Sequence, residues 1–218
     1  MTALQGTLNM LNNANKLKSY KLYGLDGKIG NVEEFYFDDH DWKVYYLIVS
    51  NSNWSTPKKV LISLHTLAYV NNKKRFMKIN LTKMQIDNCP FFYKQDCEKL
   101  QKIFQNENQL EINFNNTCDL TGYRVINSNG EIGIVKDFII DDATWIISSL
   151  IVDTRDCWPM KDVLIPAQCI KGIFCAESKI IVNNCQEADL ELLHNCHNKL
   201  INQPNKYLNL NTKNELRL

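Results

Sequence analysis

The sequence lacks the features that would point directly to a class of partner. Its 218 residues carry a net charge of only +1, so no global field draws the chain to nucleic acid or to an anionic membrane. No stretch approaches the roughly 18 apolar residues of a membrane-spanning helix, and residues 1–19 hold no apolar run of signal-peptide length. The basic run Lys-Lys-Arg at 73–75 is typical of a solvated hairpin tip. We therefore expect a cytoplasmic protein without a transmembrane segment and without direct contact to nucleic acid.

Motifs for metal, redox and nucleotide chemistry are also missing. The eight cysteines include no Cys-x-x-Cys pair, which excludes a zinc ribbon and a thioredoxin-like redox site. Without a secretory signal, reduced thiols that pack as small buried hydrophobic residues are favoured over disulfides. The two Gly-x-Ile-Gly motifs, at 27–30 and 130–133, are too short for a dinucleotide fingerprint and precede strands. We predict no cofactor.

What the sequence does contain is a long internal repeat. Shifting the chain by 103 residues places residues 20–63 on residues 123–166 without a gap, and 16 of the 44 aligned positions are identical. The segment DGKIGNVEEFYFDDHDW at 26–42 thereby matches NGEIGIVKDFIIDDATW at 129–145. A period of this length indicates a duplicated domain and not a short solenoid unit.

The repeated pattern is typical of β-structure. Asp-Gly at 26–27 and Asn-Gly at 129–130 predict type I′ hairpins, and the glycines that follow, Gly30 and Gly133, predict a bulge or tight bend. The runs after each matched tryptophan are rich in β-branched and aromatic residues, as buried strands are. About five short strands in each repeat predict a small barrel or sandwich.

The order of these motifs resembles the PRC-barrel family. The shared order is G-x-I-G-x-V, then D-D-x-x-W, L-I-V and V-L-I. That family is named for the cytoplasmic domain of the photosynthetic reaction-centre H subunit and includes the C-terminal domain of the ribosome-maturation protein RimM. Residues 118–186 look like stand-alone bacterial tandem PRC-barrel proteins, although Met160 stands where these commonly have glycine in a W-W-P-G-K loop. The resemblance implies a mainly β fold with minor α, formed by two tandem small PRC-type β-barrels with short flanking helices.

The chain organisation follows from the repeat and from helical patterns outside it. The segment LTKMQIDNC predicts a short helix closed by Pro90. The predicted units are PRC-barrel module 1 at 16–90, a linker with a helix at 91–117, PRC-barrel module 2 at 118–186, an amphipathic C-terminal helix at 187–202 and a loose tail at 203–218.

Two duplicated acidic pairs are the first candidates for chemistry. Asp38-Asp39 and Asp141-Asp142 suit an acid/base dyad for hydrolysis, or a metal site, if the pairs meet in space. The alternative is a turn in which Asp side chains bind the local backbone. We favour the turn, because adjacent residues on a strand point to opposite faces.

A histidine- and cysteine-rich segment near the C-terminus is the second candidate. His194, Cys196 and His197, with Cys185, have the residue types of a zinc site, but their spacing matches no zinc finger. The two histidines fall on the apolar face of the predicted helix, where packing is commoner than metal binding. We predict no metal ligand, and metal binding at His194, Cys196 and His197 remains the open alternative.

The tryptophans divide into two pairs. Trp42 and Trp145 begin matched strands and are expected in the core. Trp54 and Trp158 lie in loops beside a proline or near one, and loop tryptophans are favoured at protein interfaces. Packing over the barrel mouth is the competing interpretation. Trp54 and Trp158 are our candidate interaction residues, and we predict no catalytic residue.

These observations favour a non-catalytic protein-interaction or assembly module that also associates with itself. PRC barrels of the relatives named above dock onto a membrane electron-transfer complex or a ribosomal protein. The resemblance therefore implies an accessory to a membrane or ribonucleoprotein complex, with its protein partner unknown. The alternative is a small-ligand or metal-binding regulatory protein with a site between the two barrels.

Overall fold

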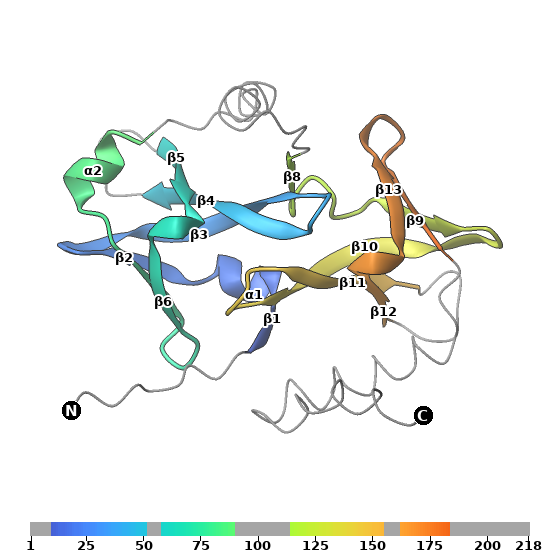
Figure 1. The fold of residues 1–218 in the computed structure, drawn as a ribbon, viewed down its shortest axis with the longest axis horizontal. Coiled ribbons are helices and arrows are strands. Elements are labelled where there is room, and N and C mark those ends of the chain that lie inside the picture. The colour runs from blue at the N-terminus through green and yellow to red at the C-terminus, as the bar shows by residue number, and fades with distance from the viewer. Residues whose placement is uncertain (1–9, 52–57, 90–113, 155–161, 184–218) are drawn as a thin grey trace, which may run out of the picture.

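The computed structural model describes residues 10–51, 58–89, 114–154 and 162–183, which form two sheets of seven strands (Figure 1). The first half contains β1 (Leu11–Asn13), α1 (Ala14–Lys18), β2 (Lys21–Gly24), β3 (Gly27–Asp38), β4 (Lys43–Asn51), β5 (Lys58–Ser63), the 3-10 turn η1 (Leu64–Thr66), β6 (Leu67–Asn71), β7 (Phe76–Ile79) and α2 (Lys83–Asp87). The second contains β8 (Phe114–Asn116), β9 (Arg124–Asn127), β10 (Gly130–Asp141), β11 (Ile147–Asp153), β12 (Asp162–Pro166), the 3-10 turn η3 (Ala167–Cys169), β13 (Ile170–Phe174), the 3-10 turn η4 (Cys175–Glu177) and β14 (Lys179–Val182).

The two sheets have the same topology. Module 1 has the strand order β5-β4-β3-β2-β7-β6, and module 2 has the order β12-β11-β10-β9-β14-β13. The strand pairs are antiparallel except β2 with β7 and β9 with β14, which are parallel. The 103-residue shift also relates β1 to β8 and β7 to β14, so the repeat extends beyond residues 20–63. Two tandem β-rich modules with few helices confirm the predicted fold class.

Each repeat opens with the expected hairpin, but the predicted turn type is wrong. The loop residues are 25–26 and 128–129, because Gly24 pairs with Gly27 and Asn127 pairs with Gly130. Within these two turns, positive φ occurs only at the glycines that begin β3 and β10, with values of 131° and 126°, whereas a type I′ turn needs positive φ at both loop residues. The glycine therefore begins the strand instead of sitting inside the turn.

The bulge predicted near the second glycine of each motif is confirmed. The register of β10 against β9 shifts between Glu131 and Gly133, and β3 shifts at the equivalent place. At Gly133 a Cβ would overlap the backbone carbonyl oxygen of Asp153, so this position needs glycine for a close approach of two strands.

One continuous hydrophobic core fills both modules. It includes buried residues of every long strand and of α1, and helix α1 contacts both β3 and β10. Trp42 and Trp145 are 8% and 6% exposed and belong to this core, as predicted. Because the core is shared, the modules do not pack as separate domains on a linker.

Helix α2 agrees with the prediction from the sequence, whereas two of the described cysteines do not. Helix α2 begins with a capping box between Thr82 and Gln85, which confirms the short helix predicted there. Of the four described cysteines, none forms a disulfide, and Cys118 and Cys175 are exposed, contrary to our expectation of buried thiols. Both lie in turns, where little side-chain area can be covered.

The predicted helix at 187–202 and the tail at 203–218 lie outside the described residues, as does all of the 91–117 linker except its last four residues, where β8 begins. None of the helices described is long and apolar enough to cross a membrane.

Candidate functional site: the junction of the two modules

The modules are joined by a reciprocal exchange of short strands. Strand β1 precedes module 1 in sequence but pairs with β10 of module 2, with Leu11 opposite Asp141. Strand β8 precedes module 2 but pairs with β3 of module 1, with Phe114 opposite Asp38. Both strands lie near the middle of the molecule, where the two sheets meet (Figure 1). The two pairings are equivalent under the 103-residue shift, so an approximate twofold axis relates the halves.

The matched tryptophans connect the modules through their backbones. Trp42 and Trp145 have φ values of 56° and 61°, in the left-handed region. The Ile147 amide donates to the Trp42 carbonyl at 2.8 Å, and the Val44 amide donates to the Trp145 carbonyl at 2.8 Å. A bulky residue in this region costs on the order of 1–2 kcal/mol. Ring burial and hydrogen bonds across the junction offset that cost.

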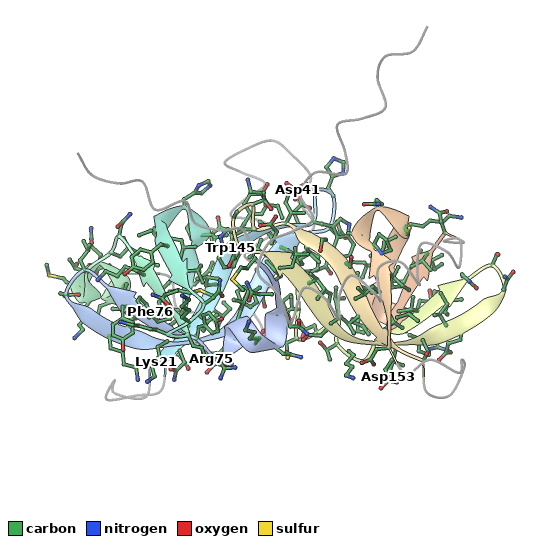
Figure 2. The ribbon with its side chains drawn as sticks, turned by 90° about the horizontal axis from the view of Figure 1, so that it is seen from below. Lys21, Asp41, Arg75, Phe76, Trp145 and Asp153 are labelled. Atoms are coloured by element: carbon green, nitrogen blue, oxygen red, sulfur yellow. The ribbon has the colours of Figure 1, made fainter. Side chains whose placement is uncertain are left out.

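The aromatic rings beside these turns form the centre of the junction. Phe37 stacks on Trp42 with ring centroids 5.2 Å apart, and it lies 6.2 Å from Phe138 of the other module. Phe35 lies 6.1 Å from Trp145, which Figure 2 labels near the middle of the molecule. Pairs of this kind contribute about 0.5–1.5 kcal/mol each beyond the burial of their area. The junction is therefore part of the folded core.

The first aspartate of each acidic pair forms the turn that we predicted. The Asp38 carboxylate accepts from the His40 amide at 3.1 Å. The Asp141 carboxylate accepts from the Ala143 amide at 2.8 Å. These are local side-chain-to-backbone bonds of the type that Asp provides in turns.

The second aspartate of each pair has a role that the sequence did not suggest. The Asp142 carboxylate accepts from the Met10 amide at 2.9 Å and from the Asn12 side-chain amide at 3.0 Å. The Asp39 carboxylate accepts from the Asn115 side-chain amide at 3.0 Å. Each therefore fixes the exchanged strand that pairs with its own module. The signal that was missed is the matched Asn-Asn at 12–13 and 115–116, which lies 103 residues apart.

Asp142 also connects the junction to the β6–β7 turn. The Asn72 side-chain amide donates to Asp142, and the Tyr20 hydroxyl donates to the Asn72 side-chain oxygen at 2.9 Å. Burial raises the pKa of Tyr20, and the nearby Arg75 guanidinium opposes the rise. Three parts of the chain that are distant in sequence thus meet at one carboxylate.

Asp137 attaches α1 to module 2. Its carboxylate is buried and accepts from the Asn15 amide at 3.1 Å and from the Phe138 amide at 2.8 Å. Burial raises the pKa of this carboxyl, and the amide donors with the Lys18 charge offset only part of the rise.

An open cleft of about 580 Å³ lies between the modules. Module 1 contributes the edge strand β6, η1 and the start of β4 to its walls, and module 2 contributes the β10–β11 turn at Asp142–Trp145. Its polar groups include Lys43, His65, Lys73, Asp142 and Thr144. No described cysteine lines this cleft, and no three His, Cys, Asp or Glu side chains converge anywhere in the described segments.

Several predicted site residues cannot be placed relative to this cleft. Trp54 and Trp158, the candidate interaction residues, lie outside the described residues, and so do Cys185, His194, Cys196 and His197. Of the candidates in the described segments, Asp142 lines the cleft, whereas Asp38 and Asp141 are used in turns.

Comparison with known proteins agrees with this duplicated architecture. A family model described as PRC-barrel domain matches the chain twice, at residues 11–86 and 113–187. The first match includes the exchanged strand β1, and the second includes the exchanged strand β8. No curated protein matches the chain.

Proposed function

The chain belongs to the PRC-barrel domain family, and from that premise we propose that it is a non-catalytic protein-interaction module. Its two modules would hold an extended segment of a partner protein in the cleft between them. The observation that carries the proposal is the position of an edge strand, β6, along a cleft whose other wall belongs to the second module. A segment bound there contacts both modules at once.

Strand β6 supports this mode of binding. Among the described strands it pairs only with β7. An edge strand presents backbone N–H and C=O groups to which an extended peptide can add as a further strand. The shared core and exchanged strands hold the two walls together, which reduces the ordering cost of binding.

The charges around the cleft favour an acidic segment. Lys43 and Lys73 lie on its walls, whereas Asp142, the acidic side chain among the described residues that line it, already accepts hydrogen bonds from two asparagine amides. Carboxylates of the partner would meet Lys43 and Lys73, and the side-chain carbons would meet Leu67 and its neighbours.

The test is affinity capture with a substitution that fills the cleft from the wall opposite β6. Ala143→Trp adds an indole at the cleft without altering β6. Ala176→Trp is the control, because Ala176 is likewise exposed but does not line the cleft. Capture from soluble and membrane fractions, kept separate, tests whether the complex lies in a membrane, and the identity of the captured partner tests whether it is a ribonucleoprotein assembly.

The proposal requires a stoichiometric partner that the native chain and Ala176→Trp retain and Ala143→Trp loses. Amine cross-links from that partner should map to Lys43 and Lys73. A partner that all three proteins retain, with cross-links elsewhere, would contradict the cleft as the docking site. The same capture with Trp54→Ala and Trp158→Ala tests those two residues, and light scattering tests self-association.

A second candidate function is regulation by a small ligand in the same cleft. Its volume of about 580 Å³ falls within the range of about 300–1,000 Å³ typical of small-molecule sites, and it lies between the modules. A ligand or divalent-metal screen by thermal shift tests this candidate. Stabilisation by one compound, lost in Ala143→Trp and kept in Ala176→Trp, would favour a ligand over a peptide.

A further inference from the structure

The outer face of module 1 gathers aromatic and basic side chains from three adjacent strands. In register across β2, β7 and β6, one row is Lys21, Phe76 and Asn71, and the next row is Tyr23, Lys78 and Tyr69. The residues between these rows, Leu22 and Met77, are buried, so the two rows face outward. With the β6–β7 turn, the basic-aromatic face comprises Lys21, Tyr23, Tyr69, Lys73, Lys74, Arg75, Phe76 and Lys78.

The three rings on this face touch one another. Phe76 lies 5.5 Å from Tyr23 and 5.8 Å from Tyr69 between ring centroids, edge-on in both pairs. Tyr69 is 46% exposed, and the other two rings are half-buried. Figure 2 shows Phe76, Lys21 and Arg75 together on module 1, away from Trp145 at the junction. The rings thus form a fixed apolar platform within a polar surface.

Five positive charges surround the platform. The β6–β7 turn exposes Lys73, Lys74 and Arg75, and Lys21 is exposed on β2. Lys78 lies in register between the two tyrosines, and its ammonium donates to the Gly24 carbonyl. Within the described segments, no carboxylate forms an ion pair with any of these five cations. Their charge is therefore available to an anionic partner.

Module 2 shows that the fold does not require this face. The three ring positions are Ile126, Gly172 and Lys179 in module 2, and the turn 73–75 becomes Ala-Glu-Ser at 176–178. Two of the three cations on the equivalent strands form ion pairs there, Arg124 with Glu131 at 3.8 Å and Lys179 with Glu177. The same backbone thus carries two ion-paired cations and one ring, Phe174, in module 2, and three contacting rings with five cations that pair with no described carboxylate in module 1.

We propose that the basic-aromatic face of module 1 binds single-stranded nucleic acid. Bases stack on exposed aromatic rings, and phosphates bind the surrounding lysine and arginine side chains. Only a partner with both planar apolar groups and regular negative charge uses both features of the face. This site departs from our expectation from the sequence, where the overall charge of +1 and the isolated run at 73–75 favoured a solvated hairpin tip over a nucleic-acid contact.

Other anionic partners fit the face less well. A duplex keeps its base faces stacked inside, so the rings would have nothing to stack on. An anionic membrane would engage rings that protrude into it, whereas Tyr23 and Phe76 are half-buried and held edge-to-face on the sheet. An acidic peptide satisfies the cations but leaves the three rings without matching planar groups. The inference is argued from other observations than the peptide proposed for the cleft, and the two surfaces share Tyr69 and Lys73 at their border.

The test is fluorescence anisotropy of the full chain with a labelled single-stranded RNA of about 12 nucleotides, within the span of about 4–16 that such surfaces cover. Duplex RNA of the same length, polyglutamate and anionic vesicles serve as competitors. We expect the single strand to bind, and these three competitors to displace it poorly at equal charge.

Substitutions separate stacking from charge. Tyr69→Ala should weaken binding roughly 5- to 150-fold, the effect of losing about one stacked base. Phe174→Ala is the matched control, since Phe174 is 42% exposed and Tyr69 is 46% exposed. Lys73→Gln with Lys74→Gln should reduce the slope of log affinity against log salt by about 1.4, from two lost phosphate contacts on a single strand. The control Arg124→Gln with Lys179→Gln removes two charges from module 2 and should leave the slope unchanged.

Four results would overturn the inference. The first two are that duplex and single strand bind with equal affinity, or that polyglutamate displaces the labelled RNA as effectively as unlabelled RNA does. The other two are that Tyr69→Ala and Phe174→Ala weaken binding equally, or that the protein binds vesicles but not RNA. Circular dichroism of each variant establishes that it is folded. Because Lys73 and Lys74 are exposed, the double glutamine variant tests the face even if loss of a ring unfolds the sheet.

Discussion

Replacing Asp142 with alanine should release the N-terminal strand from the second module. The Asp142 carboxylate accepts three hydrogen bonds, from the Met10 amide and from the side chains of Asn12 and Asn72. Two of these donors belong to β1 or the residue before it, and the third belongs to the β6–β7 turn. The substitution therefore removes the contact that joins all three segments, and leaves the β1–β10 backbone pairing and the Asp137 bond to α1 to hold the N-terminal segment.

The expected loss follows from the number of bonds and the burial of the site. A hydrogen bond to a charged group contributes about 1.5–3 kcal/mol, and we take about 1 kcal/mol for each because Asp142 is only half-buried. Three bonds then give a decrease of roughly 3 kcal/mol in the free energy of unfolding. For a chain of this size, that corresponds to a melting temperature lower by roughly 6–12 °C. Asp142→Asn should lose less, because the amide oxygen still accepts.

The measurements are thermal or denaturant unfolding together with hydrogen exchange of individual segments. Asp142→Ala should accelerate exchange in β1 and leave β8 protected. Asp39→Ala should do the opposite, because Asp39 binds Asn115 of β8 at 3.0 Å. An unfolding free energy within about 0.5 kcal/mol of native, the usual range for a surface substitution, with unchanged exchange in β1 would refute the role assigned to Asp142.

Three further outcomes are expected. Gly133→Ala should cost about 1–3 kcal/mol of unfolding free energy, because its Cβ would overlap a backbone carbonyl oxygen of β11; in the control Gly172→Ala, the Cβ meets only an exposed ring at 3.3 Å. The pKa of Asp137 is raised in the folded state above its ordinary value of about 3.9. Its contribution to the free energy of unfolding is therefore present below the ordinary pKa and is lost as pH rises through the folded pKa. The unfolding free energy of Asp137→Asn, measured with denaturant, should therefore rise relative to that of the native chain as pH goes from acid to neutral. A difference between the two free energies that does not change with pH would contradict this. Site-resolved thiol labelling should modify exposed Cys118 faster than Cys89, whose pKa is raised by burial; equal rates would contradict the exposures.

The barrels themselves could be predicted because their signals are local. Each hairpin glycine, each bulge and each tryptophan turn is specified by residues within a few positions of one another. Trp42 and Trp145 were placed in the core because they begin runs of β-branched and aromatic residues, and both are buried. The turn type was misjudged because the glycine with positive φ can sit inside a two-residue loop or begin the next strand, and the Asp-Gly pair fits either.

The strand exchange and the basic-aromatic face could not be predicted by the same reasoning. Strands β1 and β8 are three residues long, too short to show an alternating pattern, and nothing local states which sheet they join. The Asn12–Asp142 bond spans 130 residues. The basic-aromatic face draws its rings from β2, β6 and β7, and only the register between those strands brings Tyr23, Tyr69 and Phe76 together.

The exchange of strands also sets the order in which the protein can be built. A ribosome releases β1 long before it makes β10, and it completes β3 well before β8. The first half therefore leaves synthesis with one strand lacking its sheet and one sheet lacking its edge strand. Contacts of such long sequence separation form late and slowly, and an unpaired sheet edge is prone to aggregation until they do. A nascent chain stopped between the two halves would expose the edge of β3 that β8 covers in the finished protein.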